Sequence, residues 1–274
     1  MCEVPGWGHQ MAADRVLAEM RALGLTATEF GPAGFLPADP DARAALLAAH
    51  GLRAVGGFVP VVLHDPARDP LPEVRRALAA FGDADMLVLA AATGRDGYDA
   101  RPALDDEGWA TLLGNLDRLA AHAAGRGVWA TLHPHVGTLI ERGEEVDRVL
   151  AGSQIPLCLD TGHLFIGGTD PLDLARRAPG RIAHTHLKDV DADLAGRVRR
   201  GELTYTEAVR AGLYRPLGAG AIDIAAIVEI LAEAGYDGWY VLEQDTVVEA
   251  EPPPRTRPCD AVRAGIDYLE RVFP

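Results

Sequence analysis

Four apolar segments of the chain each end in side chains that can bind a metal ion or move a proton. The clearest is 155–159, an apolar run with the length of a buried strand, which is followed at once by Asp160 and His163. Proteins of the α/β class present reactive side chains to a crevice in this way. Alone, the pattern leaves a second interpretation open, in which Asp160 only caps the next turn. The other three segments are 129–135, 182–189 and 239–245.

The spacing of these segments places their ends next to one another. His133, Asp160 and His186 are 27 and 26 positions apart, which fits one strand plus one returning helix. We therefore expect neighbouring parallel strands, and alternation along each strand turns the polar side chains to one side. Two imidazoles and two carboxylates at one point are typical of a divalent-metal site. The predicted ligands are His133, Asp160, His186 and Glu243.

This mixture of nitrogen and oxygen ligands indicates which ion to expect. One divalent ion is predicted, Mn²⁺ or Co²⁺, with Zn²⁺ and Fe²⁺ as alternatives, whereas an all-oxygen site would favour Mg²⁺ or Ca²⁺. Such an ion can act as a Lewis acid on an oxygen that it binds. The competing interpretation, a set of capping acids and core histidines, must explain why four strand ends converge.

Further polar side chains near these ends have two interpretations each. His163 can carry a proton near neutral pH or orient substrate, or it can support a metal ligand. Lys188 shares a face with His186 and can hold a substrate oxygen or act as an acid, unless it is a solvated loop lysine. Glu29 is expected to bind substrate hydroxyls at a strand tip, with a loop salt bridge as the alternative. The predicted catalytic residues are His163, Lys188 and Glu243, and the predicted substrate-binding residues are Glu29, His135, His163 and Lys188.

The remaining polar candidates are weaker. His135 has the alternative role of supporting a ligand. His184 lies deeper along its strand and is predicted to be a hydrogen-bonded core residue. His64, Asp65 and Asp245 are expected on loops.

The elements that must position these side chains alternate along the chain. Apolar patterns predict seven strands and eight main helices, beginning with a helix near Gln10. This order predicts an α/β fold, a single (β/α)₈ TIM barrel over 1–274 that lacks its first strand. Either the true start lies upstream, or something irregular closes the barrel. We expect a gap between the Glu243 strand and the Thr28 strand, with unpaired backbone groups at the open edge.

Residues 191–220 form an unusually long connection after the His186 strand, with a predicted helix at 204–211. Long ordered loops in compact domains tend to be functional, and this one emerges beside Lys188 at the rim of the predicted site. We expect it to act as a lid that excludes water.

Composition limits the partners. The formal net charge is −14, which argues against nucleic acid because phosphate contacts need clustered Lys and Arg. No apolar run reaches about 18 residues and no leader-like segment opens the chain, so we expect no membrane partner and a cytoplasmic location. Cys2, Cys158 and Cys259 lack metal-type spacing and suit a reducing compartment. The expected partners are a small polyol or keto-sugar and, as an alternative to a monomer, further copies in a homodimer or tetramer.

The sequence resembles the xylose isomerase-like barrel superfamily of sugar isomerases, epimerases and endonuclease IV-type enzymes. The matching segments are Asp160-Thr-Gly-His163, His184-Thr-His-Leu-Lys-Asp189 and Glu243. Within it, the chain is most similar to the inosose (2-keto-myo-inositol) dehydratases. That likeness rests on Glu3-Val-Pro-Gly-Trp-Gly8, Thr28-Glu-Phe-Gly-Pro32, Gly56-Gly-Phe-Val-Pro60, His64-Asp65-Pro66, His133-Pro-His-Val-Gly-Thr138, Tyr214-Arg-Pro-Leu-Gly218 and Glu243-Gln-Asp245.

The resemblance implies a metal-dependent dehydratase (a hydro-lyase) that acts on a keto-inositol by enediolate formation and loss of water. Enzymes of the isomerase and epimerase branch usually have a Glu where this chain has His133, and often use two carboxylates on opposite faces of the substrate. Only Glu243 remains of that pair here, which favours elimination. A divalent-metal-dependent keto-sugar isomerase or epimerase is the alternative. An endonuclease would need a basic rim, which the acidic balance opposes.

Overall fold

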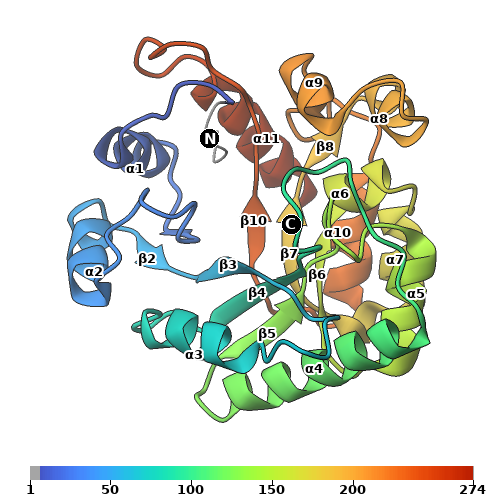
Figure 1. Ribbon diagram of the computed structural model, residues 1–274. Coiled ribbons are helices and arrows are strands. Elements are labelled where there is room, and N and C mark those ends of the chain that lie inside the picture. Colours follow the sequence, from blue (N-terminus) through green and yellow to red (C-terminus); the bar gives the residue numbers. More distant parts are fainter. Residues whose placement is uncertain (1–6, 274) are drawn as a thin grey trace.

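Six parallel strands form one curled sheet whose outer face is covered by helices (Figure 1). The computed structural model describes residues 7–273. Neighbouring strands follow the order β10-β7-β6-β5-β4-β3. Their bounds are β3 Gly56–Val61, β4 Met86–Ala91, β5 Trp129–Leu132, β6 Leu157–Asp160, β7 Ile182–Leu187 and β10 Tyr240–Leu242. All the pairs are parallel, as the alternation of strands and helices predicts.

A seventh position in the sheet comes from β1 (Ala27–Thr28), which pairs in parallel with β2 (Arg53–Ala54). The single strand predicted over 54–63 is divided here into β2 and β3, with only Val55 between them. The backbone of Val55 still donates to Thr28 and accepts from Met86, so the ladder continues across the break. The seven predicted strand positions are therefore confirmed.

Two glycines at the start of β3 permit the close approach of its neighbours. A Cβ on Gly56 would lie 1.8 Å from the carbonyl oxygen of Met86, and one on Gly57 would lie 2.5 Å from the ring of Phe30. Any larger residue would therefore push β3 away from both sides.

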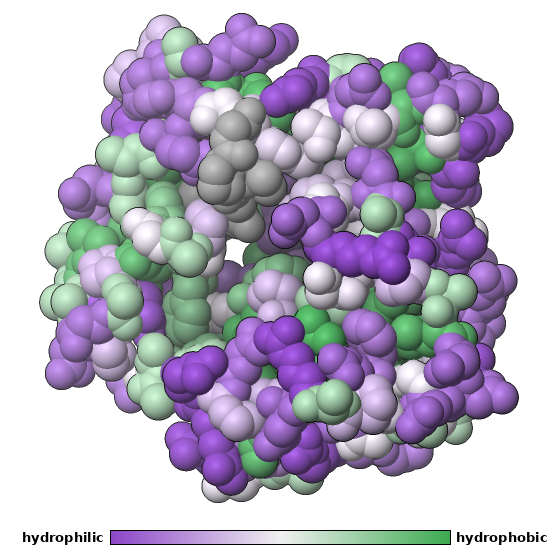
Figure 2. Space-filling model, in the orientation of Figure 1, coloured by the Kyte–Doolittle hydropathy of each residue, from purple (hydrophilic) through white to green (hydrophobic). Residues whose placement is uncertain are grey.

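Within residues 7–273 no strand joins β10 to β1, so the sheet is open at this place. The place of the missing first strand precedes α1 and falls largely outside the described residues, so its absence stays a prediction. Most of the segment 3–8, which contributed to the family likeness, lies outside the described residues, as does Cys2. On the face shown in Figure 2 hydrophilic side chains dominate, and the surface is hollowed between the N-terminal elements and the rest of the barrel.

Eight helices follow the predicted pattern, and several begin at an Asp whose carboxylate accepts a backbone N–H. The eight are α1 Ala13–Ala22, α2 Pro40–Ala49, α3 Leu71–Ala79, α4 Asp106–Ala124, α5 Gly143–Gly152, α7 Pro171–Arg177, α10 Ile224–Glu233 and α11 Cys259–Val272. The sequence patterns did not predict α6 (Thr161–Ile166), α8 (Ala192–Arg199) or the short 3₁₀ helix Pro179–Arg181. No helix among the described residues is long and apolar enough to cross a membrane.

The apolar side chains form one large core and two small ones. The large core lies between the sheet and the helices from α3 onward. A smaller cluster of Leu17, Leu36, Leu47 and Leu52 joins α1 and α2, and Ala54 of β2 contacts both this cluster and the large core. A third cluster of Val55, Met86, Val88 and Cys158 lies inside the barrel. The N-terminal elements therefore have their own hydrophobic support.

The excursion 191–220 is folded, and its helix α9 (Tyr205–Arg210) confirms the helix predicted there. It also contains α8 and the strand β9 (Tyr214–Arg215), which pairs antiparallel with β8 (Asp189–Val190). The Asp189 carboxylate accepts backbone N–H groups of Gly218, Gly220 and Ile222 at 2.8–3.0 Å. One buried carboxylate thus fixes the return of the excursion to the barrel.

Candidate metal and proton-transfer site

The four predicted ligands lie at the carboxyl ends of β5, β6, β7 and β10. Nε2 of His133 is 3.1 Å from Oδ2 of Asp160. Nδ1 of His186 is 3.6 Å from the same oxygen and 3.2 Å from Oε2 of Glu243. His133, Asp160 and His186 are buried, whereas the Glu243 side chain keeps 29% of its surface exposed. Three of the four side chains are therefore shielded and one faces open space.

Asp160 combines the two roles that the sequence left as alternatives. Its Oδ1 accepts the backbone N–H of His163 at 2.7 Å and so caps α6. Its Oδ2 faces the cluster. The helix cap therefore fixes the direction in which the second oxygen points.

Lys188 is the only lysine in the sequence, and it is buried at the centre of the cluster. Its Nζ donates to Oδ2 of Asp160 at 2.7 Å and to Oε2 of Glu243, and lies 3.8 Å from Asp245. Burial lowers the pKa of Lys188, but the charges of Asp160, Glu243 and Asp245 outweigh it and raise that pKa well above its usual value. The interpretation as a solvated loop lysine is wrong, because the ammonium is enclosed by carboxylates.

The donor set fits a divalent cation. The ligand atoms of Asp160, His186 and Glu243 lie within 4.8 Å of one another, and those of His133, Asp160 and His163 form a second such group. Asp160 belongs to both groups, so His133 lies next to the Asp160, His186 and Glu243 group through its contact with the Asp160 carboxylate. Nδ1 of His133 and of His186 have no hydrogen-bond partner among the described residues. Buried nitrogen and oxygen donors around a position that attracts an ammonium suit Mn²⁺, Co²⁺, Fe²⁺ or Zn²⁺.

Cys158 is a less suitable ligand. Its sulfur lies within the same range of His133 and His186 inside the barrel. Burial raises the pKa of the Cys158 thiol to about 11, so it stays protonated near neutral pH. Metals bind the thiolate, and the oxygen-rich side of the cluster is therefore the better site.

The protonation states suit ligands. Burial raises the pKa of Asp160, but Lys188 and the neighbouring imidazoles lower it well below its usual value. Burial likewise raises the pKa of Glu243, but the charges of His186 and Lys188 outweigh burial and lower this pKa well below its usual value. For His133, burial lowers the pKa and leaves the ring neutral near pH 7. The two acids are therefore charged and His133 has a free lone pair. Burial lowers the pKa of His186, but the charges of Glu243 and Glu29 outweigh it and raise that pKa well above its usual value, so a metal would have to displace a proton from this ring.

His135 and His163 form a stacked pair beside the ligands. Their ring centroids are 3.7 Å apart with an interplanar angle of 35°. Nδ1 of His135 donates to the carbonyl of Val136 at 2.7 Å. Burial lowers the pKa of His135 to about 3, and burial also lowers that of His163 well below its usual value. Both rings are neutral near pH 7, so each has one N–H that can donate a hydrogen bond and one nitrogen that can accept one.

Glu29 lies against two histidines of β7. Its Oε1 accepts from Nε2 of His184 at 2.7 Å and from Nε2 of His186 at 3.0 Å. Burial raises the pKa of Glu29, but the charge of His186 and the two ring N–H groups lower it to about 2. His184 is fully buried, which confirms the prediction of a hydrogen-bonded core residue. The predicted contact of Glu29 with substrate hydroxyls stays a prediction.

Sequence reasoning missed an aromatic wall around the cluster. Phe58 is 39% exposed, and its ring lies 5.6 Å from the rings of both His133 and His135. Tyr205 of α9 lies 6.0 Å from His163, and its hydroxyl is 2.7 Å from that of Tyr214. Phe58 lies two residues after Gly56 and so shares its side of β3, a signal that strand alternation could have supplied.

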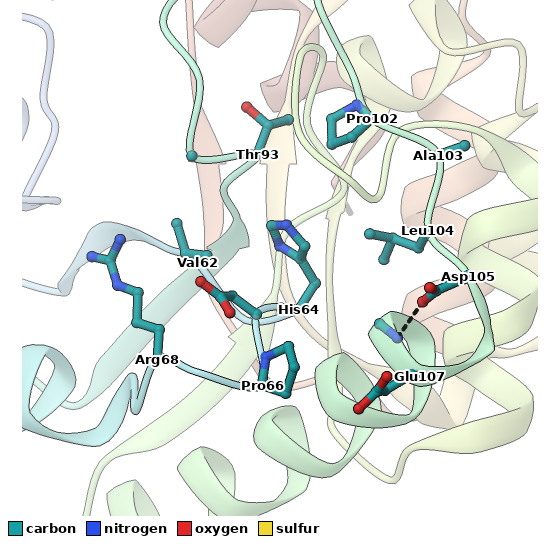
Figure 3. A pocket seen from close by; sticks show the side chains of 13 residues that line it. Val62, His64, Pro66, Arg68, Thr93, Pro102, Ala103, Leu104, Asp105 and Glu107 are labelled. Atoms are coloured by element: carbon teal, nitrogen blue, oxygen red, sulfur yellow. Dashed lines mark hydrogen bonds between the residues drawn. The ribbon is translucent and has the colours of Figure 1, made fainter.

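The weaker candidates His64 and Asp65 lie in a separate cavity of about 610 Å³ (Figure 3). None of the proposed ligands lines it. Asp105 there is occupied in capping α4 through the N–H of Gly108. The lining consists of Val62, His64, Asp65, Pro66, Arg68, Thr93, Gly94, Pro102, Ala103, Leu104, Asp105, Glu107 and Gly108. These residues therefore belong to the rim beyond β3 and β4 and not to the cluster.

The family of the chain follows from its match over residues 17–272 to the xylose isomerase-like TIM barrel family. The chain belongs to this family. It is 31% identical to the inosose dehydratase of Geobacillus kaustophilus (strain HTA426), over 98% of this chain and 90% of the relative. It is 32% identical to the rhizopine catabolism protein MocC of Rhizobium meliloti, over 98% and 84%. The resemblance found in the sequence is thereby confirmed.

Solved structures show the same fold. The probable 3-DHS dehydratase AsbF from Bacillus anthracis superposes with a TM-score of 0.70 at 14% identity, covering 96% of this chain and 95% of that one. An L-ribulose 3-epimerase superposes with a TM-score of 0.67 at 18% identity, covering 97% and 91%. The predicted xylose isomerase-like barrel is confirmed.

Proposed function

We propose that this chain is a divalent-metal-dependent dehydratase, a hydro-lyase, that acts on a keto-inositol (an inosose). The observation that carries the proposal is the convergence of Asp160, His186 and Glu243 around one cation position, which Lys188 occupies in part. Several relatives over nearly the full chain are named inosose dehydratase, which supports the substrate class and the loss of water. Mn²⁺ or Co²⁺ is the proposed ion.

When bound, the cation would hold the ketone oxygen and a neighbouring hydroxyl and stabilise the negative charge that develops on them. Glu243 is ionised and partly exposed, and it is proposed to take the proton from the carbon beside the ketone. The C–O bond one carbon further then breaks as the double bond forms. Lys188 gives its ammonium proton to the departing hydroxyl, which leaves as water, and the neutral ring of His163 orients the substrate by a hydrogen bond.

Residues around the cluster are proposed to bind and enclose the substrate. The exposed ring of Phe58 offers an apolar surface to the C–H bonds on one face of the substrate ring. The excursion 191–220 acts as a lid, because it brings Tyr205 next to His163 and Tyr98, at ring distances of 6.0 and 5.1 Å. His135 completes the wall on the opposite side of His163. Water excluded in this way cannot compete for the charged intermediate.

The test is a product analysis. The purified protein, stripped of metal and then supplied with Mn²⁺, is incubated with 2-keto-myo-inositol and with a panel of ketoses, and the products are read by NMR. The expected result is a dehydrated diketone from the keto-inositol and no change in the ketoses. Equilibration of ketose epimers without any dehydrated product would refute the dehydratase and establish the alternative, a keto-sugar isomerase or epimerase.

A further inference from the structure

Glu29 contacts the two histidines of β7, with which its ligand atoms also lie within 4.8 Å of one another, whereas Asp160 and Glu243 form a group with the other side of His186. Glu29 follows β1, on the far side of the open place in the sheet from β10, and reaches β7. Its side chain is 12% exposed, and one of its oxygens accepts both ring N–H groups of His184 and His186. A carboxylate that is largely buried and hydrogen-bonded to two imidazoles can hold the orientation of a histidine ring. It is less free to move and bind a substrate hydroxyl.

The hydrogen bond from His186 decides which of its nitrogens can bind a metal. A metal binds the imidazole in its neutral form, which has one N–H and one lone pair, so a proton held on Nε2 leaves the lone pair for the metal on Nδ1. Nδ1 of His186 is the nitrogen near Asp160 and Glu243, at 3.6 and 3.2 Å. It is buried and has no hydrogen-bond partner of its own among the described residues. The nitrogen opposite Glu29 is therefore the one that points at the cation position.

His184 has a supporting place in this arrangement. It precedes His186 by two positions on β7, so both rings project to the same side, with centroids 5.2 Å apart. Its Nε2 makes the shorter bond to Glu29, 2.7 Å against 3.0 Å. His184 thus fixes the carboxylate, and the carboxylate in turn fixes the ring of His186.

We propose that Glu29 is a positioning residue for the metal centre: it holds the Nε2–H of His186 and so directs the Nδ1 lone pair to the position between Asp160 and Glu243. The inference rests on the metal dependence in the proposed function. It gives Glu29 a different task from the contact with substrate hydroxyls that the sequence suggested. Carboxylates that orient a ligating histidine typically change metal affinity by about 10–100-fold when they are removed.

The experiment compares Mn²⁺ binding by calorimetry in the wild type, Glu29→Ala and Glu29→Gln, all as metal-stripped full-length protein. We expect Glu29→Ala to bind Mn²⁺ about 10–100-fold more weakly. The loss should be smaller for Glu29→Gln, because the amide oxygen can still accept an N–H. Asp14→Ala is the matched control. Asp14 also contacts an imidazole, that of His50 at 3.2 Å, and it lies in the N-terminal part of the chain, far from β7 in sequence. Its Mn²⁺ affinity should equal that of the wild type.

A second measurement reads the ring itself. In Zn²⁺-loaded protein, long-range ¹H–¹⁵N spectra should show His186 bound through Nδ1 and protonated at Nε2, and Glu29→Gln should shift the Nε2 signal while the Zn²⁺ stays bound. Metal bound through Nε2 of His186, or equal Mn²⁺ affinity in folded Glu29→Ala and wild type, overturns the inference. A higher KM with unchanged Mn²⁺ affinity also overturns it, in favour of a substrate contact. A wild type that binds no Mn²⁺ refutes the proposed function as well, so the two failures are distinguishable.

Discussion

Replacement of Lys188 by methionine should destabilise the metal-free protein and at the same time improve its binding of Mn²⁺. The change removes the ammonium that pairs with Asp160 and Glu243, and it leaves a side chain of similar length in the buried space. Breaking a buried ion pair by removal of one partner costs about 3–5 kcal/mol, because the remaining charge is left uncompensated. With a urea m-value of about 3 kcal/mol/M, the unfolding midpoint should fall by about 1–1.7 M.

Mn²⁺ should reverse most of this loss. The ion and the ammonium compete for the same oxygen of Asp160, which lies 2.7 Å from Nζ of Lys188. Without the ammonium, the carboxylates are free to bind the metal, so Lys188→Met should bind Mn²⁺ more tightly than the wild type. Saturation at about 100 times Kd adds about 2.7 kcal/mol to the stability of the folded state. Turnover should nevertheless fall, because a proton donor is lost.

The stability lost in Lys188→Met depends on pH, because it depends on the charge of the two carboxylates. The folded-state pKa values of Asp160 and Glu243 lie well below their usual values of 3.8 and 4.5. Their contribution to wild-type stability is therefore present above those usual values and is lost as the pH falls toward the folded-state values. The difference between wild type and Lys188→Met should be full at pH 7 and shrink below about pH 4.

The assay is urea unfolding followed by circular dichroism, in EDTA and in Mn²⁺ at pH 7, and in EDTA at about pH 3, where the carboxylates begin to take up protons. Arg118→Met is the control, because its ion pair with Asp69 is about half exposed and screened by water, so its removal should change stability little. The reasoning is refuted if Lys188→Met loses the same stability with and without Mn²⁺, or if its Mn²⁺ affinity falls below that of the wild type.

Three further changes test other parts of the site. Asp160→Asn keeps an oxygen for the N–H of His163 and so should fold, yet metal analysis should find no bound ion; equal metal content in variant and wild type would contradict the ligand set. His133→Glu restores a second carboxylate and should lower the dehydration rate. If metal analysis finds the ion bound, NMR tests this variant for epimerisation of ketoses. Deletion of 203–211 removes α9 with Tyr205, and kcat should fall far more than the metal content. An equal fall of kcat and of metal content would argue against a lid.

The sequence predicted those features that depend on local pattern and spacing. The interval from His133 to Asp160 to His186 was enough to place these residues on adjacent strands, since a strand and its returning helix have a limited range of lengths. The open place between β10 and β1 followed from the absence of an apolar segment before the first helix. Both predictions use only the order and length of elements.

What escaped prediction depends on contacts between distant segments. Lys188 was predicted at the site, on the face of His186, but its burial as an ion-pair partner depends on Asp160 and Glu243, which come from two other strands. Glu29 is 155 positions from His184, so no local pattern joins them. Helix α6 was missed because a six-residue helix that begins at the strand end has too few turns to show a period.

The separate leucine cluster of the N-terminal elements has a consequence for how the protein loses activity on heating. Leu17, Leu36, Leu47 and Leu52 form a small hydrophobic unit that meets the large core at the partly buried Ala54, and among residues 7–273 no strand pairs β1 with β10. Such units open sub-globally at a lower free energy than the whole domain. Because Glu29 belongs to this part of the chain, its opening would release His186 while the remaining strands stay folded. Amide hydrogen exchange should therefore be faster in α1 and α2 than in β4, and thermal inactivation should precede the main unfolding transition.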